Sequence, residues 1–333
     1  MGTYTREIVA AMEPLRPQHR LALVRQPQTR LIGRHLLYPR EVRRWKPDAF
    51  FAPAGHSPLG SPGVPEVATV HDLAIYRHPE WFPPRQPLAT RVVVPRSLRR
   101  AAALIAVSRS TALDIVELFT IDPKRVTVVH HGVSPRFRPL PPAEVAEVRA
   151  RLGLPERYLL FVSTIEPRKN LGTLLDAWAA LPERPRLVVG GGWGWRHAEV
   201  RRRLEALRPE VVLLGDVMPE DLPALYSGAA CLAHPAWYEG FGLTVLEAMA
   251  CGTPVVCSNA SSLPEVGGDA VLYAPPGDAA AWRWALHRVL ADPVLATGLR
   301  ERGLDRARAF TWKRAAEATW RVIESAAGHT APG

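Results

Sequence analysis

The chain has 333 residues, of which 47% are apolar, and its formal net charge is +10 at neutral pH. This length is enough for two ordinary domains or one large one, and the apolar content is enough for a sizeable core, so we expect a globular protein. A membrane-spanning helix needs about 18 consecutive apolar residues, and no such run occurs. The N-terminus lacks the apolar centre of a signal peptide, because Arg6, Glu7 and Glu13 interrupt it. We therefore expect a cytoplasmic protein.

The three cysteines, Cys231, Cys251 and Cys257, are an odd number and have no C-x-x-C spacing. They stand in apolar surroundings that are typical of strands and helix ends. We interpret them as reduced thiols of the core, and neither a disulfide framework nor a zinc site is supported.

The positive charge comes mostly from arginine and could attract anionic partners. Its densest run is Arg91, Arg96, Arg99 and Arg100, at a spacing that predicts one basic face of a helix. That face is either simply solvated or a patch for anionic lipid headgroups at the inner surface of the membrane. In the second case the protein would attach peripherally.

The first elements along the chain predict an α/β domain. A helix is expected at residues 4–12, and short apolar or β-branched runs follow, alternating with segments of helical periodicity, which is the βαβ rhythm of a parallel sheet. The expected strands are residues 20–24, 49–54, 66–70, 103–107 and 125–129. A doubly wound domain normally begins with its central strand, so the first strand of this domain is expected to be missing.

The rhythm restarts after a proline-rich connection at residues 130–158, which contains one short helix. Strands are expected at 159–163, 186–190, 211–215, 229–234, 254–258 and 270–274, and terminal helices at 278–292 and 311–326. The restart predicts two similar Rossmann-like domains, residues 1–140 and 141–310, that face each other across a cleft. Residues 311–333 are expected to form a helix that crosses back to the first domain.

The stretch "WYEGFGLTVLEAMACGTPVV" follows the expected strand 229–234, and ligands bind beyond the carboxyl ends of parallel strands. Gly240 and Gly242 let backbone N–H groups approach a ligand closely. A helix beginning near Leu243 would direct the positive end of its dipole to the same place. The expected ligand is a phosphate or diphosphate.

Two carboxylates flank these glycines. Glu239 precedes the helix and would repel a diphosphate unless it faced hydroxyl groups, so sugar hydroxyls suit it. Glu247 has an alternative interpretation, because Thr244 and Glu247 fit the S/T-x-x-E capping box that closes a helix start.

Two further loops carry candidate residues after expected strands. Arg168 and Lys169 place two cations beside a helix N-terminus, where the dipole disfavours them unless an anion is present; the alternative is an ordinary exposed basic pair. His71 directly follows strand 66–70 and is equally compatible with a structural or a functional role.

Several motifs of other functions are absent. The chain contains no D-x-D, H-E-x-x-H, G-x-S-x-G or G-x-x-x-x-G-K-[ST], so metal-bound diphosphate, zinc hydrolysis, serine hydrolysis and P-loop chemistry lose support. A nucleic-acid-binding protein would interleave aromatic and basic residues on one surface, which we do not see. We therefore expect no bound metal and no nucleic-acid partner.

The stretch "EGFGLTVLEAMACGTPVVCSN" resembles the E-x7-E signature of retaining glycosyltransferases of family 4, which have the GT-B fold. The segments "VHDLAIYRHPEWF", "AVSRSTALDI", "VTVVHHGVSPRF", "EPRKNLGTLLDAW", "LGDVMPEDLPALYSGAACLAHP" and "GGDAVLYAPPGD" resemble the same family in order, over nearly the whole chain. The motifs "HPEWF" and "EPRKN" resemble those of bacterial mannosyltransferases of polysaccharide assembly.

The resemblance implies a role for each candidate residue. Glu239 would contact the transferred hexose near the reacting carbon, and His71 would face it from the first domain. The remaining donor-binding residues would be Arg168 and Lys169 at the diphosphate, the segment Gly240, Phe241, Gly242, Leu243 and Thr244, Glu247 at the ribose and Val217 at the base.

The resemblance implies a metal-independent, retaining transferase that uses no cofactor and moves a hexose from a nucleotide diphosphate sugar to a saccharide or lipid-linked acceptor. The family branch suggests GDP-mannose, while the residues themselves leave the donor sugar, its base and the acceptor open. Many members carry an arginine where this chain has Ser163 and Thr164. The alternative enzyme is a nucleotide-sugar epimerase on the same fold, which would release an isomer without needing an acceptor.

Overall fold

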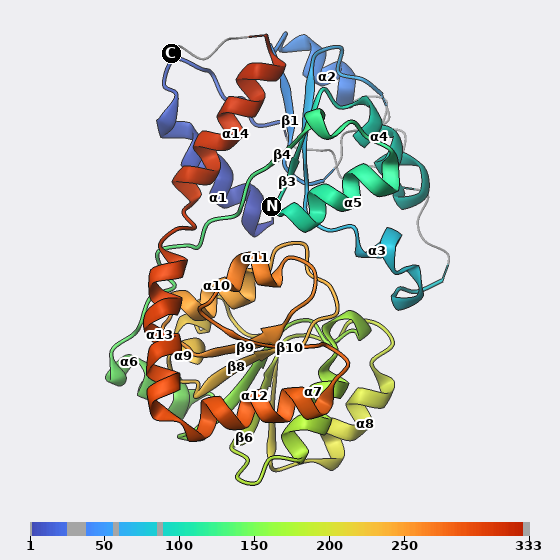
Figure 1. The fold of residues 1–333 in the computed structure, drawn as a ribbon. Coiled ribbons are helices and arrows are strands. Elements are labelled where there is room, and N and C mark those ends of the chain that lie inside the picture. Colours follow the sequence, from blue (N-terminus) through green and yellow to red (C-terminus); the bar gives the residue numbers. More distant parts are fainter. Residues whose placement is uncertain (1, 25–37, 56–59, 85–88, 329–333) are drawn as a thin grey trace. The chain divides into compact units, whose positions relative to one another are not determined.

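The computed structural model describes residues 2–24, 38–55, 60–84 and 89–328. The chain divides into two compact units. Unit 1 comprises Met1–Pro79, Pro84–Gly132 and Thr311–Gly333, and unit 2 comprises Glu80–Pro83 and Val133–Phe310. Each unit is an α/β structure with its own parallel sheet, as Figure 1 shows.

The sheet of unit 1 has four parallel strands in the order β1-β2-β3-β4. The strands are β1 (Phe50–Ala52), β2 (Glu66–Val70), β3 (Ala103–Ala106) and β4 (Val126–Val128). Successive residues of a strand point to opposite faces, and both faces are apolar here. Ala68 and Leu104 pack with α4 (Val94–Arg100) and α5 (Arg109–Phe119), whereas Val67 and Ile105 pack with α1 (Thr3–Met12) and α14 (Trp312–Ala326). The described helices of this unit are α1 (Thr3–Met12), α2 (Tyr38–Arg44), α3 (Ala74–Arg77), α4 (Val94–Arg100), α5 (Arg109–Phe119) and α14 (Trp312–Ala326).

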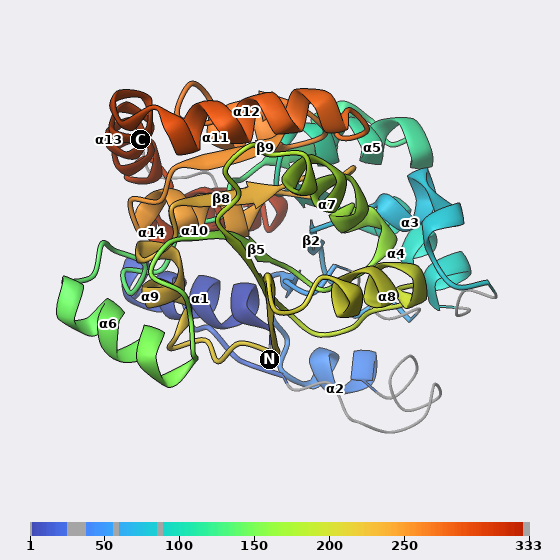
Figure 2. The ribbon, with the colours of Figure 1, turned by 90° about the horizontal axis from the view of Figure 1, so that it is seen from below.

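Helices α1 and α14 come from opposite ends of the chain and lie side by side in unit 1 (Figures 1 and 2). Ile8 and Met12 of α1 pack against Ala316 and Trp320 of α14. The indole Nε1 of Trp320 donates a hydrogen bond of 2.9 Å to the backbone carbonyl of Met12. The C-terminal helix therefore completes the core of the unit that contains the N-terminus.

The sheet of unit 2 has six parallel strands in the order β10-β9-β8-β5-β6-β7. They are β5 (Tyr158–Val162), β6 (Arg186–Gly190), β7 (Val211–Gly215), β8 (Cys231–His234), β9 (Val255–Ser258) and β10 (Leu272–Ala274). Trp178 of α7 and Trp282 of α12 are fully buried in the core against these strands. The helices are α6 (Pro142–Arg151), α7 (Leu171–Ala179), α8 (Ala198–Ala206), α9 (Leu222–Ser227), α10 (Leu243–Ala250), α11 (Leu263–Gly267), α12 (Ala279–Ala291) and α13 (Pro293–Ala307).

The strand order of unit 2 creates a topological switch point between β5 and β8. The chain leaves β5 toward β6 and β7 at one edge, and then returns to β8, β9 and β10 on the other side of β5. The loops that follow β5 and β8 therefore diverge, and the crevice outside these carboxyl ends is where open parallel sheets bind ligands. The residues after β5 and β8 include the motifs with Arg168, Lys169 and Glu239.

Residues Glu80–Pro83 leave unit 1 and pack in unit 2. The indole Nε1 of Trp195 donates to the carbonyl of Trp81 over 2.8 Å, and the Phe82 ring lies 5.3 Å from the Trp195 ring. The "HPEWF" motif thereby contributes to the surroundings of the glycine-rich loop after β6.

The predicted α/β class is confirmed, and the strands expected from residue 49 onward are present with shifts of a few residues at their ends. The strand expected at residues 20–24 is wrong, because these residues form no strand in the part of the chain that the structure describes. Leu21 packs against the cluster around α1 and α14, but Leu23 is 60% exposed, so the alternating pattern buries only one side chain. Helix α1 is the first element in the described chain.

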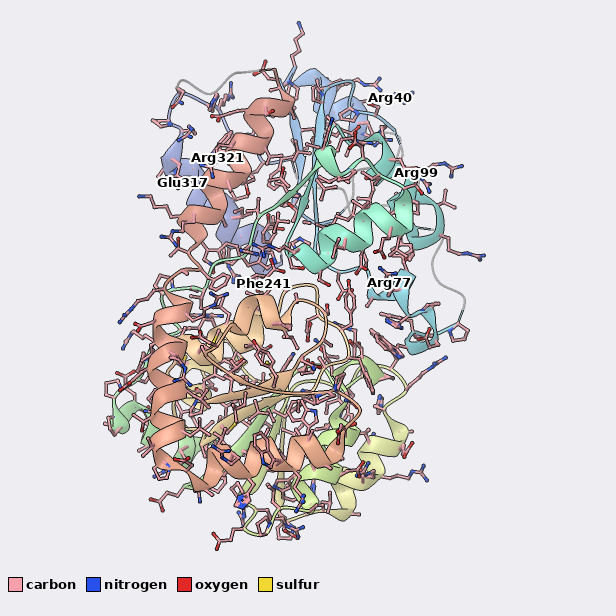
Figure 3. The ribbon with its side chains drawn as sticks, viewed as in Figure 1. Arg40, Arg77, Arg99, Phe241, Glu317 and Arg321 are labelled. Carbon is pink, nitrogen blue, oxygen red and sulfur yellow. The ribbon has the colours of Figure 1, made fainter. Side chains whose placement is uncertain are left out.

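Two further expectations need correction. Arg91, Arg96 and Arg99 are exposed on the π-helical segment Ala89–Val93 and on α4 (Arg99 is labelled in Figure 3), but Arg100 is bound to the buried carboxylate of Glu66 at 2.8 Å. The basic face is therefore smaller than predicted. Helix α13 was not foreseen as a separate helix, because few of its residues are buried and its apolar periodicity is weak.

All three cysteines are buried and form no disulfide, as expected. Across the described parts of the chain, no helix combines the length and the apolar character that a membrane crossing requires.

Candidate active site

The loop after β5 is anchored by Asn170. Pro167 begins a 3-10 turn, and Asn170 then adopts the left-handed conformation at φ 55° and caps the start of α7. Its Nδ2 donates to the carbonyl of Pro235 at 3.0 Å and to that of Pro276 at 2.5 Å. The loops after β5, β8 and β10 are thus tied together by one side chain, which fixes the backbone next to Lys169.

The loop after β8 is held by serines from the loop after β9. The Ser262 hydroxyl lies 2.9 Å from the carbonyl of Glu239 and 2.8 Å from that of Phe241. Gly242 has φ +104°, and an added Cβ there would stand 2.8 Å from the side chain of Leu263. Only glycine satisfies both conditions without a shift, so this position sets the sharp turn into α10.

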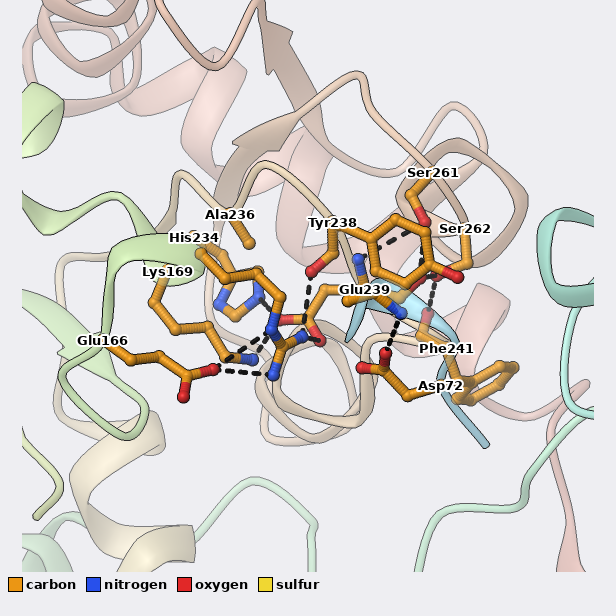
Figure 4. A network of polar contacts seen from close by, with 12 residues as sticks. Asp72, Glu166, Lys169, His234, Ala236, Tyr238, Glu239, Phe241, Ser261 and Ser262 are labelled. Atoms are coloured by element: carbon orange, nitrogen blue, oxygen red, sulfur yellow. Dashed lines mark hydrogen bonds and ion pairs between the residues drawn. The ribbon is translucent and has the colours of Figure 1, made fainter. Parts of the chain in front are cut away.

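Four charged side chains meet between these two loops (Figure 4). Lys169 Nζ lies 2.5 Å from Glu239 Oε1, and Arg168 Nη1 lies 3.3 Å from Glu239 Oε2. Arg168 also binds Glu166 at 2.9 Å and donates to the carbonyl of Tyr238 at 3.0 Å. The two cations and two carboxylates balance, which is the condition under which charges remain buried.

Glu239 is strongly ionised despite its burial. Burial by itself raises the pKa of this carboxyl and is the largest single effect, but the Lys169 ammonium, the hydrogen bond from His234 and the Arg168 guanidinium together outweigh it. The pKa of Glu239 therefore lies well below its usual value, and the group is an anion with acceptor capacity only.

His234 is the last residue of β8 and is 1% exposed. Its Nε2 lies 2.7 Å from Glu239 Oε1. Burial lowers the pKa of the imidazole, and Glu239 offsets this only in part. His234 is therefore neutral at neutral pH, and its Nε2–H must be the donor, since Glu239 cannot donate.

Glu247 lies inside α10, and its carboxylate accepts a hydrogen bond of 3.2 Å from the Tyr226 hydroxyl. Burial raises the pKa of Glu247 to about 7, while the Tyr226 bond and the Arg136 charge act in the opposite direction. The alternative capping box is wrong. The helix begins at Leu243 after Gly242, so Thr244 is not the capping residue.

Val217 and the glycine-rich loop lie at the same carboxyl edge of the sheet. A Cβ added at Gly190 would meet Val217 at 2.8 Å, and one at Gly192 would meet Asp216 at 2.5 Å. The loops after β6 and β7 therefore touch closely, and the glycines permit that contact.

His71 stands at the carboxyl end of β2 in unit 1. Its Nε2 donates to the carbonyl of Pro53 at 2.7 Å, and its ring lies 4.5 Å from the Tyr4 ring and 5.4 Å from the His131 ring. Burial lowers the pKa of His71, against the opposing effect of the Pro53 hydrogen bond. This histidine is a neutral imidazole in a cluster of aromatic rings.

Comparison with known proteins identifies the family. Residues 5–137 match the family model described as Glycosyltransferase Family 4, and residues 145–307 match that of Glycosyl transferases group 1. The O-antigen chain mannosyltransferase B of Escherichia coli is 34% identical over 304 residues, which cover 88% of this chain and 79% of that protein. This chain belongs to the family 4 glycosyltransferases.

One further relative and one solved structure are similar to this glycosyltransferase. The D-inositol 3-phosphate glycosyltransferase of Salinispora arenicola (strain CNS-205) is 34% identical over 275 residues, or 76% of this chain and 61% of that protein, so the chain spans about three fifths of that relative. The structure of HepE from Anabaena, solved with UDP and glucose, has a TM-score of 0.77 at 19% identity and covers 97% of this chain and 96% of its own. The transferase therefore has the GT-B fold.

Four residues of this transferase site were not foreseen from the sequence: Glu166, Asn170, Tyr226 and His234. Glu166 and Asn170 flank the predicted basic pair, and His234 ends a predicted strand. A polar residue that ends a buried strand is the signal that could have found His234. In the residues that the structure describes, no group of three or more His, Cys, Asp or Glu side chains could hold a metal ion.

Proposed function

We propose that this glycosyltransferase moves a hexose from a nucleoside diphosphate sugar to a saccharide or lipid-linked acceptor, with retained anomeric configuration and without a divalent metal or cofactor. GDP-mannose is the proposed donor, because a relative that covers most of the chain is named as a mannosyltransferase. UDP-glucose is the alternative donor to test, because HepE was solved with UDP and glucose.

The observation that carries the proposal is the pairing of buried Lys169 and partly buried Arg168 with the buried carboxylates of Glu239 and Glu166 at the β5–β8 switch point. A diphosphate seated at the N-terminus of α10 would meet these two cations and the backbone N–H groups of Leu243 and Thr244. As the glycosidic bond breaks, negative charge grows on the leaving phosphate oxygen. Fixed cations and amide dipoles stabilise that charge without further reorganisation.

Glu239 is proposed to bind hydroxyl groups of the hexose near the reacting carbon. Its Oε1 already accepts from Lys169 and His234, while a carboxylate can accept about four hydrogen bonds. We propose no covalent role for it; the acceptor is proposed to attack from the face that the leaving group vacates.

The other donor contacts extend this arrangement. Glu247 is proposed to accept the ribose hydroxyls, Val217 to lie against the base, and His71 to face the hexose as a neutral imidazole, as the family resemblance implies. The segment that would wrap the diphosphate and hexose comprises Gly240, Phe241, Gly242, Leu243 and Thr244.

The acceptor is proposed to bind unit 1. Arg91, Arg96 and Arg99 are exposed there, and such a group would favour an anionic leaflet by about 1 kcal/mol for each charge near the surface. A lipid-linked acceptor would then meet the enzyme at the membrane.

The test is a panel of GDP and UDP sugars, scored first by thermal stabilisation and then by transfer. A ligand that binds only the folded state raises the melting temperature. We expect one donor to stabilise the wild type, and Lys169→Met to abolish that shift, whereas Lys124→Met, an exposed lysine of unit 1, keeps it. Equal shifts in Lys169→Met and the wild type would contradict the proposal.

A further inference from the structure

The Glu239 carboxylate is contacted by three side chains in the described part of the structure: Lys169, Arg168 and His234. Lys169 and Arg168 are cations, and the proposed function assigns both to the diphosphate. A bound diphosphate would compete with Glu239 for these two charges, because all the groups lie within one small region. His234 is neutral and has no such second task.

The position of His234 is rigid. It is paired with Cys257 of β9 in the sheet register, and its ring is almost completely buried. The imidazole Nε2–H meets Glu239 Oε1 at 2.7 Å across only five positions of the chain, at the start of the loop that carries Glu239. The loop therefore folds back onto the strand that it leaves.

The second ring nitrogen supports the same tautomer. Nδ1 of His234 is buried and has no hydrogen-bond partner among the residues described here. A bare lone pair is the less costly form at such a place, because an N–H there would be an unsatisfied donor. The proton therefore belongs on Nε2, where it holds the carboxylate.

We propose that His234 is the positioning residue of Glu239: its Nε2–H keeps Oε1 fixed when Lys169 and Arg168 turn to the diphosphate, and so directs Oε2 to the hydroxyl groups of the hexose. This inference rests on the proposed function and adds to it a residue that acts through Glu239. A charged residue in place of His234 would itself attract the diphosphate. A neutral donor holds the carboxylate without that competition.

The inference predicts a defect in hexose handling and none in nucleotide binding. In His234→Ala, kcat for transfer should fall about tenfold to a hundredfold, as expected for the loss of one hydrogen bond to a charged group. The affinity for free GDP or UDP should stay within about twofold of the wild type. His234→Gln keeps an amide donor within reach of Glu239 and should recover most of the lost rate.

A double-mutant cycle separates positioning from packing. Calorimetry measures the affinity for the sugar nucleotide and for the free nucleotide, either GDP-mannose and GDP or UDP-glucose and UDP. The readout is the ratio of these two affinities. His234→Ala should reduce this ratio in the wild-type background and leave it unchanged in Glu239→Gln, because the two residues act as one unit. The surface variant His287→Ala serves as the control, since His287 is exposed on α12.

Three results would overturn the inference: wild-type kcat in His234→Ala, equal losses in His234→Ala and His234→Gln, or an undiminished effect of His234→Ala in Glu239→Gln. Failure of the proposed function itself would look different. The wild type would then show no saturable binding of either nucleotide, and the inference would fall with it.

Discussion

The carboxyl edges of the two sheets differ in chemistry although both sheets are parallel. At the edge in unit 2, Lys169, Arg168, Glu166 and Glu239 form a buried network of opposite charges. At the edge in unit 1, His71 lies among aromatic rings and donates to a backbone carbonyl. The strand topology thus provides the place for a site, while the loops decide which chemistry occurs there.

The ionisable groups at the two edges also differ in how burial affects their pKa values. In unit 2 the pKa of Glu239 stays low because neighbouring cations outweigh its burial. In the described part of unit 1, burial lowers the pKa values of His71 and His131, and the hydrogen bond to the Pro53 carbonyl opposes this only in part at His71. Buried charges without partners are costly, so unit 2 is the edge suited to an anionic ligand.

Lys169→Met should reduce kcat/KM for transfer by about a hundredfold to a thousandfold, the size found when one group that stabilises developing negative charge is removed. Lys169→Arg keeps the positive charge, so its kcat/KM should fall less than that of Lys169→Met. Steady-state rates of nucleoside diphosphate release in the presence of acceptor would measure this. A Lys169→Met enzyme within threefold of the wild type would remove the leaving-group role.

Glu239→Gln should lose about a hundredfold in transfer, yet bind free GDP or UDP as tightly as the wild type or a few times more tightly. The reason is that the carboxylate competes with the diphosphate for Lys169 and Arg168, and an amide does not. Calorimetric titration measures the affinity. Glu210→Gln, which removes a similar charge from an exposed pair with Arg184, is the matched control. A large loss of nucleotide affinity in Glu239→Gln alone would show that the carboxylate does not compete.

His71→Ala should lower kcat by about tenfold or more while leaving the affinity for free nucleotide unchanged, because nucleotide binding is assigned to unit 2. A neutral imidazole contributes through hydrogen bonding and position. His71→Gln keeps a donor for the Pro53 carbonyl and separates the structural bond from a role in transfer. An equal loss of affinity for free nucleotide in His71→Ala and His71→Gln would place His71 in the donor site.

Glu247→Gln should have the smallest effect on transfer, with nucleotide affinity about two- to fivefold weaker at pH 8, since a carboxylate accepts two ribose hydroxyls and an amide accepts less well. The folded pKa of about 7 lies above the ordinary value of 4.5, so the folded state keeps a proton that the unfolded state releases. The contribution of Glu247 to the free energy of unfolding therefore falls as pH rises from 4.5 to 7.

Glu247→Gln lacks this titration, so its stability relative to the wild type should improve between pH 5 and pH 8. Urea unfolding at the two pH values measures the difference. An equal change in the free energy of unfolding of the two proteins between these pH values would show that the pKa of Glu247 is not raised.

Much of the fold could be predicted because short apolar runs that alternate with amphipathic segments have few solutions other than a parallel sheet. Residues 20–24 were wrongly predicted as a strand because their leucines alternate with other residues, as in a strand. Only Leu21 of the two leucines is packed. A pattern of five residues does not show whether a neighbouring strand exists to pair with it.

The basic pair and Glu239 could be foreseen, because each conflicts with its local surroundings unless a ligand is present. The contacts of Glu166, Asn170 and His234 could not. They depend on β5 lying next to β8, and Lys169 and Glu239 are 70 positions apart in the chain. Strand order is a tertiary property, so motif spacing alone does not reveal which loops meet.

The most direct measurement is a calorimetric titration of GDP and UDP into the wild type, Lys169→Met and Glu239→Gln under one buffer and salt condition. We predict one saturable site in the wild type for at least one nucleotide, an affinity at least tenfold weaker in Lys169→Met, and an affinity equal or higher in Glu239→Gln. Equal affinities in all three proteins would contradict a diphosphate site at the carboxyl ends of β5 and β8.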